Sequence, residues 1–487
     1  MVRTRVAPSP TGYPHVGSLY QAWLDYAFAK KHDGKFLIRI EDTDRTRFVA
    51  DAEEKIYEGL DWAGLTEDES PRKPGDVGPY RQSQRLDIYK KHAQELVAKG
   101  HAYYCFCTPE RLNQVRTEMQ KVGKVPMYDR HCRNLSPEEV QQRIQAGEKY
   151  VIRLKVPDNQ TIKVQDLIRG EITFHSNDVD DQVLLKSDGF ATYHLASMVD
   201  DHLMGITHVV RGEEWLPSSP KHILIYDFFG WEKPVFFHTP TLRNPDKSKL
   251  SKRKGHTNIL WYKEQGFLPE ALINYLSLMG WSHPEEKDIF SKEEFIKLFD
   301  LKDFSPAGPI FDEVKLRWMN GKYIREVISE DELFNKLKQY LTLPISDEIL
   351  KKTIPLIKER LEVLSDINEL LKFLLPEQEI DVELVKKQSN QSKNDQSLTG
   401  KSPEEIKQLL TDLKTVLENL DTWETGEIEK VIRNLKGKYK DWGGRDYFMT
   451  IRVATTAFPV TPPLFESIEV LGKDLVLQRI ESVLQRL

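Results

Sequence analysis

The sequence lacks any apolar run long enough to span a bilayer, and it has only three cysteines among 487 residues. The first absence predicts that no helix crosses a membrane. So few cysteines exclude a disulfide framework and favour a reducing compartment. The first residues also lack a charged segment followed by an apolar one, so we expect no export and a cytoplasmic location.

An excess of positive charge is also missing, because the net charge is −6. Proteins that bind nucleic acid without sequence preference are usually basic overall, although a local basic face is enough for binding. One basic run is present: Arg243, Lys247, Lys249, Lys252, Arg253 and Lys254. Without further context, a solvated loop is the ordinary interpretation of such a run. The length predicts about two to four domains.

The first part of the chain has the pattern of a β-α-β unit. "RTRVAP" and "KFLIRI" are short apolar strands, separated by a helical pattern over residues 19–32. This order predicts a parallel sheet with a right-handed crossover. A second α/β portion follows later, with the strand "GITHVVRG" and the helix "KHILIYDFFGW". About a hundred residues of different character lie between them, including "KYVIRLKV" and a hairpin signal at Asp188-Gly189, which indicates an insertion.

Strand signals end near Ser305, and helical periodicity continues to the C-terminus. Ser402 and Glu405 have the spacing of a capping box at the start of one amphipathic helix. A polar stretch before this helix, "KKQSNQSKNDQSLTGKS", predicts a loose connection between two helical modules. We therefore expect an α/β multidomain chain: a Rossmann-type parallel sheet split by an α/β insertion, followed by an all-helical C-terminal half.

A candidate phosphate site lies where the first strand turns into the first helix. Ligands of open parallel sheets bind beyond the carboxyl ends of the strands, where the following helices present free N–H groups. Gly17 lets a ligand approach the backbone, and His15 adds a hydrogen-bond donor beside it. An H-x-G tripeptide alone is weak evidence, because a turn histidine is the commoner case.

A lysine-rich segment, "KLSKRKG", adds weight to this interpretation. Lys249 and Lys252 flank Leu250 and Ser251, and two ammonium groups so close together repel one another unless an anion lies between them. A triphosphate that becomes pyrophosphate would suit the pair.

Several stretches together carry a family resemblance. "SPTGYPHVGS" resembles the HIGH signature of class I aminoacyl-tRNA synthetases, and "KLSKR" resembles their KMSKS loop. "RVAPSPTGYPHVG", "IRIEDTDRTR", "YHLASMVDDHLMGITHVVRGEEW" and "KLSKRKGHTNI" are together similar to bacterial glutamyl-tRNA synthetases. The similarity runs over nearly the whole chain, and the helical C-terminal half matches the glutamate enzymes rather than their glutamine-specific relatives, which usually carry a β-rich anticodon region.

This resemblance implies a glutamate–tRNA ligase. Such an enzyme uses ATP with Mg²⁺ to make glutamyl-adenylate from L-glutamate, then transfers the glutamyl group to the terminal adenosine of tRNA(Glu), with tRNA(Gln) as a second candidate. We expect a monomer. The implied domains are the two halves of the catalytic domain (1–85 and 190–240), an inserted acceptor-stem-binding domain (86–189), a stem-contact region with the lysine loop (241–328), and two helical anticodon-binding modules (329–390 and 391–487).

A glutamate substrate has two carboxylates and one ammonium, so its site needs two cations and one anion. Arg5 and Arg211 fall at predicted strand ends, and arginine can hold a carboxylate with two parallel hydrogen bonds. Glu41 can take the ammonium, and Tyr193 offers a hydroxyl. The alternative is that the arginines form structural ion pairs with Asp42, Asp44 or Glu213.

Further site residues come from the resemblance alone. It adds Ala7 and Ser9 to the glutamate site, assigns Arg5 to the side-chain carboxylate, and assigns Arg211 to the α-carboxylate. Ser197 departs from the family, which usually has Asn there, so its contact with substrate is in doubt. The implied ATP-binding residues are Thr11, His15, Gly17, Glu214, Trp215, Leu242, Lys249 and Lys252, of which His15, Lys249 and Lys252 are the catalytic candidates.

The three cysteines lie in the predicted insertion. Cys105, Cys107 and Cys132 suggest a zinc site, which needs a fourth ligand. Related enzymes often have His at the position of Asn134, so Tyr128, four residues before Cys132, and His131 are the candidates here. The alternative is a vestigial site with buried free thiols.

Other functions are also open. A nucleotidyltransferase acting on a small molecule without RNA would share the nucleotide signature, but the long segment after the lysine loop argues against it. A truncated relative that glutamylates a modified base lacks the helical half. A non-catalytic RNA-binding relative is disfavoured because His15, Lys249 and Lys252 are intact. Candidates for RNA contact in the helical half are Arg445, Arg452, Trp442, Tyr447 and Phe448.

Overall fold

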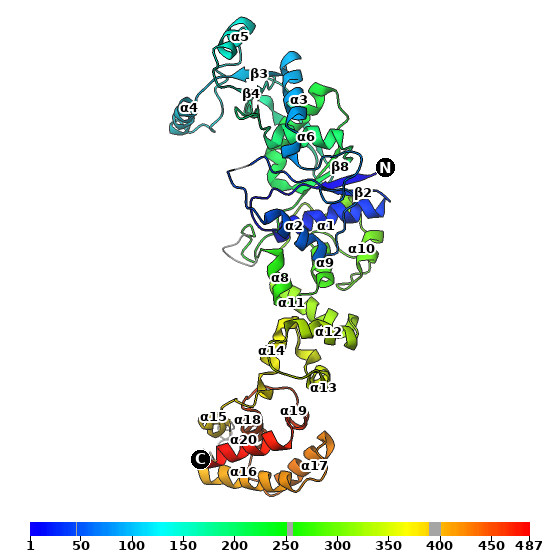
Figure 1. Cartoon of the computed structure of the whole chain (residues 1–487), viewed down its shortest axis with the longest axis vertical. Helices are drawn as coiled ribbons and strands as arrows, with labels where there is room; N and C mark the ends of the chain where they lie inside the picture. The colour runs from blue at the N-terminus through cyan, green and yellow to red at the C-terminus, as the bar shows by residue number, and fades with distance from the viewer. Residues whose placement is uncertain (45, 251–256, 389–400) are drawn as a thin grey trace. The chain divides into compact units, whose positions relative to one another are not determined.

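The computed structural model describes residues 1–44, 46–250, 257–388 and 401–487 (Figure 1). They form two compact units, of which the first contains residues 1–263 and 269–316 and the second contains residues 264–268 and 317–487. Residues 317–328 of the predicted stem-contact region thus fall in the second unit. In the described part of the chain, no helix is both long and apolar enough to cross a membrane.

The predicted β-α-β unit is confirmed at the start of the first unit. Strands β1 (Arg3–Val6) and β2 (Lys35–Ile38) pair in parallel, and helix α1 (Val16–Lys31) connects them. Strands β8 (His208–Gly212) and β9 (Val235–Thr239) are also parallel. The amide of Thr207 donates to the carbonyl of Arg3 at 3.0 Å, which brings β8 beside β1. The carboxyl ends of β2, β1 and β8 therefore meet at one edge.

Helices cover this sheet because its strands are apolar on both faces. Phe36, Leu37 and Ile38 of β2 are fully buried, which is typical of a parallel strand covered on both sides. The helices α6 (Tyr193–Leu203) and α7 (Ser219–Phe229) pack against each other in this core. The other helices that begin in the first unit are α2 (Ala52–Trp62), α8 (Ile259–Gln265), α9 (Pro269–Ser277), α10 (Lys292–Leu298) and α11 (Glu313–Lys322).

The predicted insertion builds a sheet of its own. Its strands β3 (Ala102–Cys105), β4 (Val151–Leu154) and β7 (Val183–Leu185) are antiparallel, and its helices are α3 (Leu86–Ala98), α4 (Pro109–Lys121) and α5 (Pro137–Gln145). The hairpin of β5 (Thr161–Asp166) and β6 (Gly170–His175) instead joins β9 of the Rossmann-type sheet, where Asp166 pairs with Phe236. A segment of the insertion therefore extends this sheet on the far side of β9 from β8.

The described residues of the second unit are helical, as predicted. Its helices are α12 (Glu330–Tyr340), α13 (Asp347–Ile357), α14 (Ile367–Leu370), α15 (Val382–Gln388), α16 (Pro403–Glu418), α17 (Thr425–Lys436), α18 (Gly444–Thr456), α19 (Leu464–Leu471) and α20 (Lys473–Arg486). The capping box at the start of α16 is confirmed, because Ser402 and Glu405 exchange side chain to backbone hydrogen bonds. Most of the predicted loose connection, residues 389–400, lies outside the described residues.

Candidate active site

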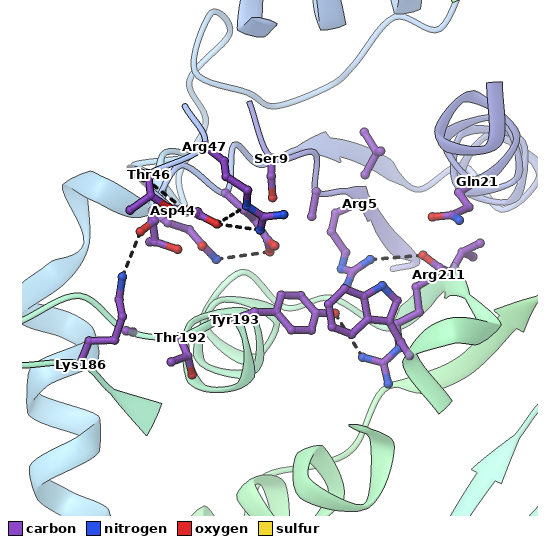
Figure 2. Close-up of a pocket in the computed structure, with 18 of the residues that line it drawn as sticks. Arg5, Ser9, Gln21, Asp44, Thr46, Arg47, Lys186, Thr192, Tyr193 and Arg211 are labelled. Atoms are coloured by element: carbon purple, nitrogen blue, oxygen red, sulfur yellow. Dashed lines mark hydrogen bonds and ion pairs between the residues drawn. The ribbon is translucent and has the colours of Figure 1, made fainter. Parts of the chain in front are cut away.

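A cavity of about 680 Å³ opens where β1, β2 and β8 end (Figure 2). All six residues predicted to bind glutamate line it: Arg5, Ala7, Ser9, Glu41, Tyr193 and Arg211. The predicted nucleotide-binding residue Trp215 lines the cavity as well, and the centroids of the Trp215 and Tyr193 rings are 4.2 Å apart. The sheet thus brings residues from distant parts of the sequence to one cavity.

Arg5 is held in a structural ion pair. Its Nε and Nη2 donate to the two carboxylate oxygens of Asp201 at 2.9 and 3.2 Å, and its Nη1 donates to the carbonyl of Val210 at 3.4 Å. Both side chains of the pair are buried. In the sequence analysis, a structural ion pair with Asp42, Asp44 or Glu213 is the alternative to substrate binding. Arg5 does form a structural ion pair, but its partner is Asp201. One N–H group of Nη1 and one of Nη2 at the end of the Arg5 guanidinium are left for a ligand.

Arg211 is buried without a carboxylate partner among the described residues. Its exposed fraction is 4%, and its guanidinium donates to Tyr193, Ser219, His222 and His238, all of which are uncharged acceptors. Its Cζ also lies 5.1 Å from the ring centroid of Phe236. A buried cation is costly unless an anion accompanies it, so this side chain presents an uncompensated positive charge to the cavity.

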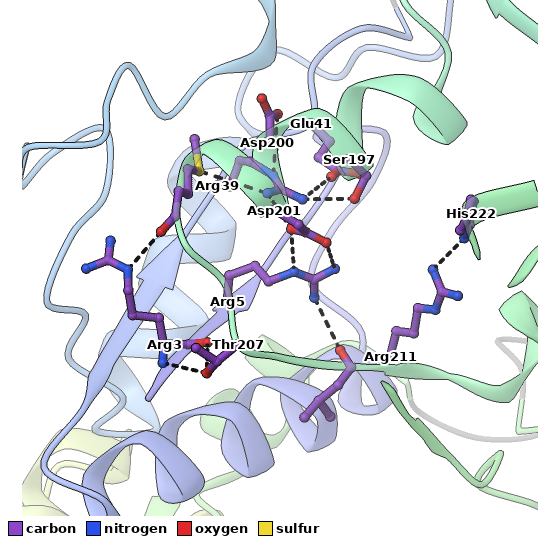
Figure 3. Close-up of polar contacts among 12 residues, drawn as sticks. Arg3, Arg5, Arg39, Glu41, Ser197, Asp200, Asp201, Thr207, Arg211 and His222 are labelled. Carbon is purple, nitrogen blue, oxygen red and sulfur yellow. Dashed lines mark hydrogen bonds and ion pairs between the residues drawn. The ribbon is translucent and has the colours of Figure 1, made fainter. Parts of the chain in front are cut away.

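Glu41 belongs to a buried network of charges next to the cavity (Figure 3). Arg39 donates to Glu41 at 3.1 Å, to Asp201 at 2.7 Å, and to Ser197 at 2.9 Å. Burial raises the pKa of Glu41 above its usual range, and the Arg39 charge opposes that rise. Ser197 is fully buried in this network, so its hydroxyl supports Arg39.

The sequence analysis missed Arg39, Asp200 and Asp201, although these charged residues interrupt the apolar patterns of β2 and α6. It also missed Asp25 of α1, which lines the cavity and is fully buried. Neither carboxyl oxygen of Asp25 has a hydrogen-bond partner in the described part of the chain. Burial raises the pKa of Asp25 well above its usual range. The sequence signal that could have identified Asp25 is an acidic residue within a helix of otherwise mostly apolar positions.

A second cavity, of about 220 Å³, adjoins the first at Val6 and Ser9 and is lined by the predicted nucleotide residues Thr11 and His15. His15 caps α1, because its Nδ1 accepts from the amide of Gly17 at 2.9 Å. This bond requires the ring proton of a neutral His15 to lie on Nε2. Gly17 makes room for the cap, since a Cβ there would lie 3.2 Å from the His15 Nδ1.

The prediction of free N–H groups at the start of α1 is wrong. The amide of Gly17 is used by His15, that of Val16 donates to Thr257 at 2.7 Å, and that of Ser18 donates to the carbonyl of His15 at 2.8 Å. The first turn is thus capped from within the protein. A phosphate near this helix would find these three amides already in use.

Lys252 lies outside the described residues, so its predicted position beside His15 stays a prediction. The residues on both sides of that segment are described. Leu250 donates its amide to the carbonyl of Leu242 at 3.0 Å. On the other side, Ile259 donates its amide to the carbonyl of Pro14 at 3.0 Å. The described residues just before position 251 therefore lie beside Leu242, and those just after position 256 lie beside the His15 signature.

The other predicted nucleotide residues occupy different surroundings. Lys249 and Glu214 are exposed, whereas the side chain of Leu242 is buried. Glu214 lies against Gly212, where a Cβ would clash with its carboxylate. The exposed Glu214 side chain would have to move if position 212 carried a Cβ.

The three cysteines converge in the insertion. Their sulfur atoms lie within 4.8 Å of one another, with Cys107 Sγ 3.6 Å from Cys132 Sγ. The hydroxyl of Tyr128 lies 3.3 Å from Cys105 Sγ and 3.4 Å from Cys107 Sγ, whereas His131 is exposed. A hydrogen bond from Cys132 and one from Tyr128 lower the pKa of Cys105 to about 4. The cluster therefore loses a first proton readily, as a metal site must.

The helical half offers fewer surface candidates than we expected. Trp442 and Tyr447 are buried in the core of the second unit, so these two candidates for RNA contact are core residues. Arg452 donates to Thr461 and Pro462 beside it. Arg445 is exposed and Phe448 is half-buried.

Known proteins resemble the chain over its whole length. Residues 1–318 match the model of the catalytic domain of class I tRNA synthetases (E and Q), and residues 332–484 match an anticodon binding domain. A glutamate–tRNA ligase of Acidothermus cellulolyticus is 46% identical over 98% of this chain and 94% of its own. One from Thermus thermophilus is 46% identical over 99% of this chain and 100% of its own.

Solved structures agree with this match. A glutamate tRNA ligase from Elizabethkingia meningosepticum, solved in complex with its amino acid, superposes with a TM-score of 0.87 at 37% identity over 99% of both chains. The glutamate-tRNA synthetase of Elizabethkingia anophelis superposes with a TM-score of 0.86 at 36% identity, also over 99% of both chains. The resemblance inferred from the motifs is therefore confirmed, and the chain belongs to the class I tRNA synthetases of the glutamate and glutamine (E and Q) family.

Proposed function

We propose that this chain is a glutamate–tRNA ligase that activates L-glutamate with ATP and transfers it to tRNA. The observation that carries the proposal is Arg211, a buried cation facing the cavity without a carboxylate partner in the described residues. A ligand carboxylate would supply the missing charge. Glu41 lines the same cavity and can take an ammonium group. An α-amino acid has both groups.

The residue roles follow from this charge pattern. Arg211 binds the α-carboxylate, Glu41 the ammonium, and the end of the Arg5 guanidinium the side-chain carboxylate. Ala7, Ser9 and Tyr193 complete the glutamate site. Because Arg5 is already paired with Asp201 through Nε and Nη2, its contact with substrate uses the remaining N–H groups of Nη1 and Nη2.

ATP occupies the adjoining cavity and enters as its magnesium complex. In this proposal the nucleotide contacts Thr11, His15, Gly17, Glu214, Trp215, Leu242, Lys249 and Lys252. The substrate carboxylate attacks the α-phosphorus in line and pyrophosphate leaves. Lys249, Lys252 and the Nε2–H of His15 neutralise the charge that develops on the phosphates. The 2′-hydroxyl of the terminal adenosine of tRNA then attacks the carbonyl carbon of glutamyl-adenylate, and AMP leaves. Neither step needs a protein nucleophile.

Glutamate-dependent exchange of pyrophosphate into ATP, with and without tRNA, tests the function. We expect exchange together with charging of tRNA(Glu). Exchange without any charging would favour the small-molecule nucleotidyltransferase, and RNA binding without exchange would favour the non-catalytic relative. The match of residues 332–484 to an anticodon binding domain supports the ligase over both, and over the truncated relative.

The range of tRNA substrates is a finer question. Relatives named glutamate–tRNA ligases support tRNA(Glu) as the substrate, and tRNA(Gln) stays a second candidate. Parallel charging assays on the two purified tRNAs decide between them. The monomeric state and the cytoplasmic location predicted from the sequence stay predictions.

We further propose that zinc binds the cysteine cluster, with Cys105, Cys107 and Cys132 as thiolate ligands and Tyr128 as the fourth. The donor set fits, because ligand sulfurs about 2.3 Å from a tetrahedral zinc are about 3.8 Å apart, and Cys107 and Cys132 are 3.6 Å apart. The guanidinium of Arg111, 3.4 Å from Cys107, would offset the negative charge of three thiolates. The metal would stabilise the insertion. Metal analysis of protein purified without chelator tests this, and fewer than about one zinc in ten chains would contradict it.

A further inference from the structure

The partners of Arg211 share a feature beyond being uncharged. Three secondary-structure elements contribute them: β9 supplies His238 and α6 supplies Tyr193, while α7 supplies Ser219 and His222. The two histidines are fully buried. Each accepts a hydrogen bond from Arg211 at 3.0 Å, His238 through Nε2 and His222 through Nδ1. The arginine is therefore held by different ring nitrogens of two histidines.

An acceptor nitrogen must carry its lone pair, so the proton of a neutral ring lies on the other nitrogen. In His238 the other nitrogen is Nδ1, which lies 2.7 Å from the carboxylate of Asp166. Asp166 comes from the β5–β6 hairpin of the insertion, where its second oxygen accepts the amides of Ile168 and Arg169. A fixed carboxylate thus holds the Nδ1 proton of His238.

In His222 the other nitrogen is Nε2, which lies 3.0 Å from Nδ1 of His194 (the bond from Arg211 to His222 is drawn in Figure 3). His194 therefore accepts the Nε2 proton of His222. Burial lowers the pKa of all three histidines, to about 4 for His194 and His238 and well below the usual range for His222. All three rings are neutral at pH 7.

We infer that His238 and His222 are positioning residues for Arg211, held in opposite tautomers so that they orient its guanidinium without neutralising it. His238 carries its proton on Nδ1 and His222 on Nε2. A carboxylate at either position would satisfy the arginine's charge and compete with the carboxylate of the substrate. The two histidines keep that charge available for glutamate. This inference rests on the proposed function, in which Arg211 binds the α-carboxylate.

The two rings call for opposite conservative replacements. The amide group of Asn reaches the place of a histidine Nδ1, and that of Gln reaches the place of Nε2. H238Q keeps an acceptor for Arg211, whereas H238N keeps only the contact with Asp166. At position 222 the order is reversed: H222N keeps the acceptor and H222Q loses it. Replacing Asp166 is a poorer test, because Asp166 also closes the β5–β6 turn.

The four variants are compared by glutamate-dependent pyrophosphate exchange. We expect H238N and H222Q to raise the KM for glutamate about tenfold or more, as the loss of one charge-assisted hydrogen bond requires. H238Q and H222N should each recover most of that loss, while the KM for ATP changes less than about twofold in all four. Equal losses for the two amides at either position, or the reverse order, would overturn the inference.

A measurement on the wild-type protein does not depend on the folding of the variants. Nitrogen-15 spectra of histidine-labelled protein distinguish the two neutral tautomers, and H238Q and H222N assign the two rings by loss of their signals. We expect the proton on Nδ1 in His238 and on Nε2 in His222. The same tautomer in both rings would refute the inference. Wild-type protein that shows the opposite tautomers but no glutamate-dependent exchange would refute the proposed function instead.

Discussion

Val16 donates its amide to the carbonyl of Thr257 at 2.7 Å, which ties the start of α1 to the first described residue after the lysine-rich segment. The two signatures that the sequence analysis paired are far apart in the chain, yet a backbone hydrogen bond joins them. The same bond uses an amide that a phosphate would otherwise find at the helix start. In the proposed reaction, His15, Lys249 and Lys252 are the side chains that bind the phosphates.

We predict that Lys252→Ala lowers turnover in pyrophosphate exchange about 10²- to 10³-fold, because the lysine acts on charge that develops during the reaction. Binding of tRNA should stay near the wild-type level, since the proposed role concerns ATP alone. A filter-binding titration with tRNA provides the control. An unchanged exchange rate would remove Lys252 from the catalytic residues.

We predict that Gly17→Ala lowers turnover several-fold. The added Cβ would lie 3.2 Å from His15 Nδ1, so the imidazole must shift and the cap weakens by about 1 kcal/mol. Gly426→Ala in α17 is the matched control, because a Cβ there meets nothing within 4 Å. Similar exchange rates for the two variants would show that the position of the His15 ring does not limit the reaction.

Arg5 and Arg211 should respond differently to replacement by glutamine. Arg5→Gln leaves the buried Asp201 with Arg39 as its remaining arginine, so we expect a loss of stability of about 3 kcal/mol together with weaker selection of glutamate over glutamine. Arg211→Gln leaves no carboxylate unpaired, so we expect near-normal stability and a KM for glutamate raised about 10- to 100-fold.

Thermal melting and exchange kinetics on both arginine variants check these expectations. If Arg211→Gln melts as low as Arg5→Gln, Arg211 has a structural partner that the proposed role does not include. If Arg5→Gln keeps the wild-type preference for glutamate, another residue recognises the side chain of the substrate.

The stability of the first unit should depend on pH through Asp25. Burial raises the pKa of its carboxyl in the folded protein, whereas the unfolded chain has the ordinary value of about 3.9. The protonated group therefore favours folding at acid pH, and this contribution is lost as the pH rises through the folded-state pKa.

The side chain of the Asp25→Asn variant does not titrate. We expect this variant to gain stability relative to wild type as the pH is raised from 5 to 8, by about 1–3 kcal/mol. Urea unfolding of both proteins at several pH values measures the difference. A difference that does not change with pH would show that Asp25 finds a partner in solution.

Much of the fold was predictable because it follows from local patterns. The strands β1, β2 and β8 and the helix α1 come from short apolar runs and turn signals, and the capping box at Ser402 comes from two residues three positions apart. Residues that end parallel strands share one edge of a sheet, so the convergence of Arg5, Glu41 and Arg211 on one cavity could also be predicted.

The ion-pair partners could not be predicted in the same way. Both arginines lie near the ends of similar strands, yet Arg5 meets Asp201 of α6 whereas Arg211 meets only neutral groups of α6, α7 and β9. The expected free amide of Val16 failed for the same reason, since its acceptor Thr257 is remote in sequence, whereas the amides of Gly17 and Ser18 donate to His15 nearby.

The sequence by itself determined the family, the order of the elements and the set of charged residues at the strand ends, because each depends on short spacings. Only the tertiary structure decided which arginine is neutralised and which keeps its charge. That outcome depends on the helices and strands packed around each guanidinium, and residues from distant parts of the chain supply them.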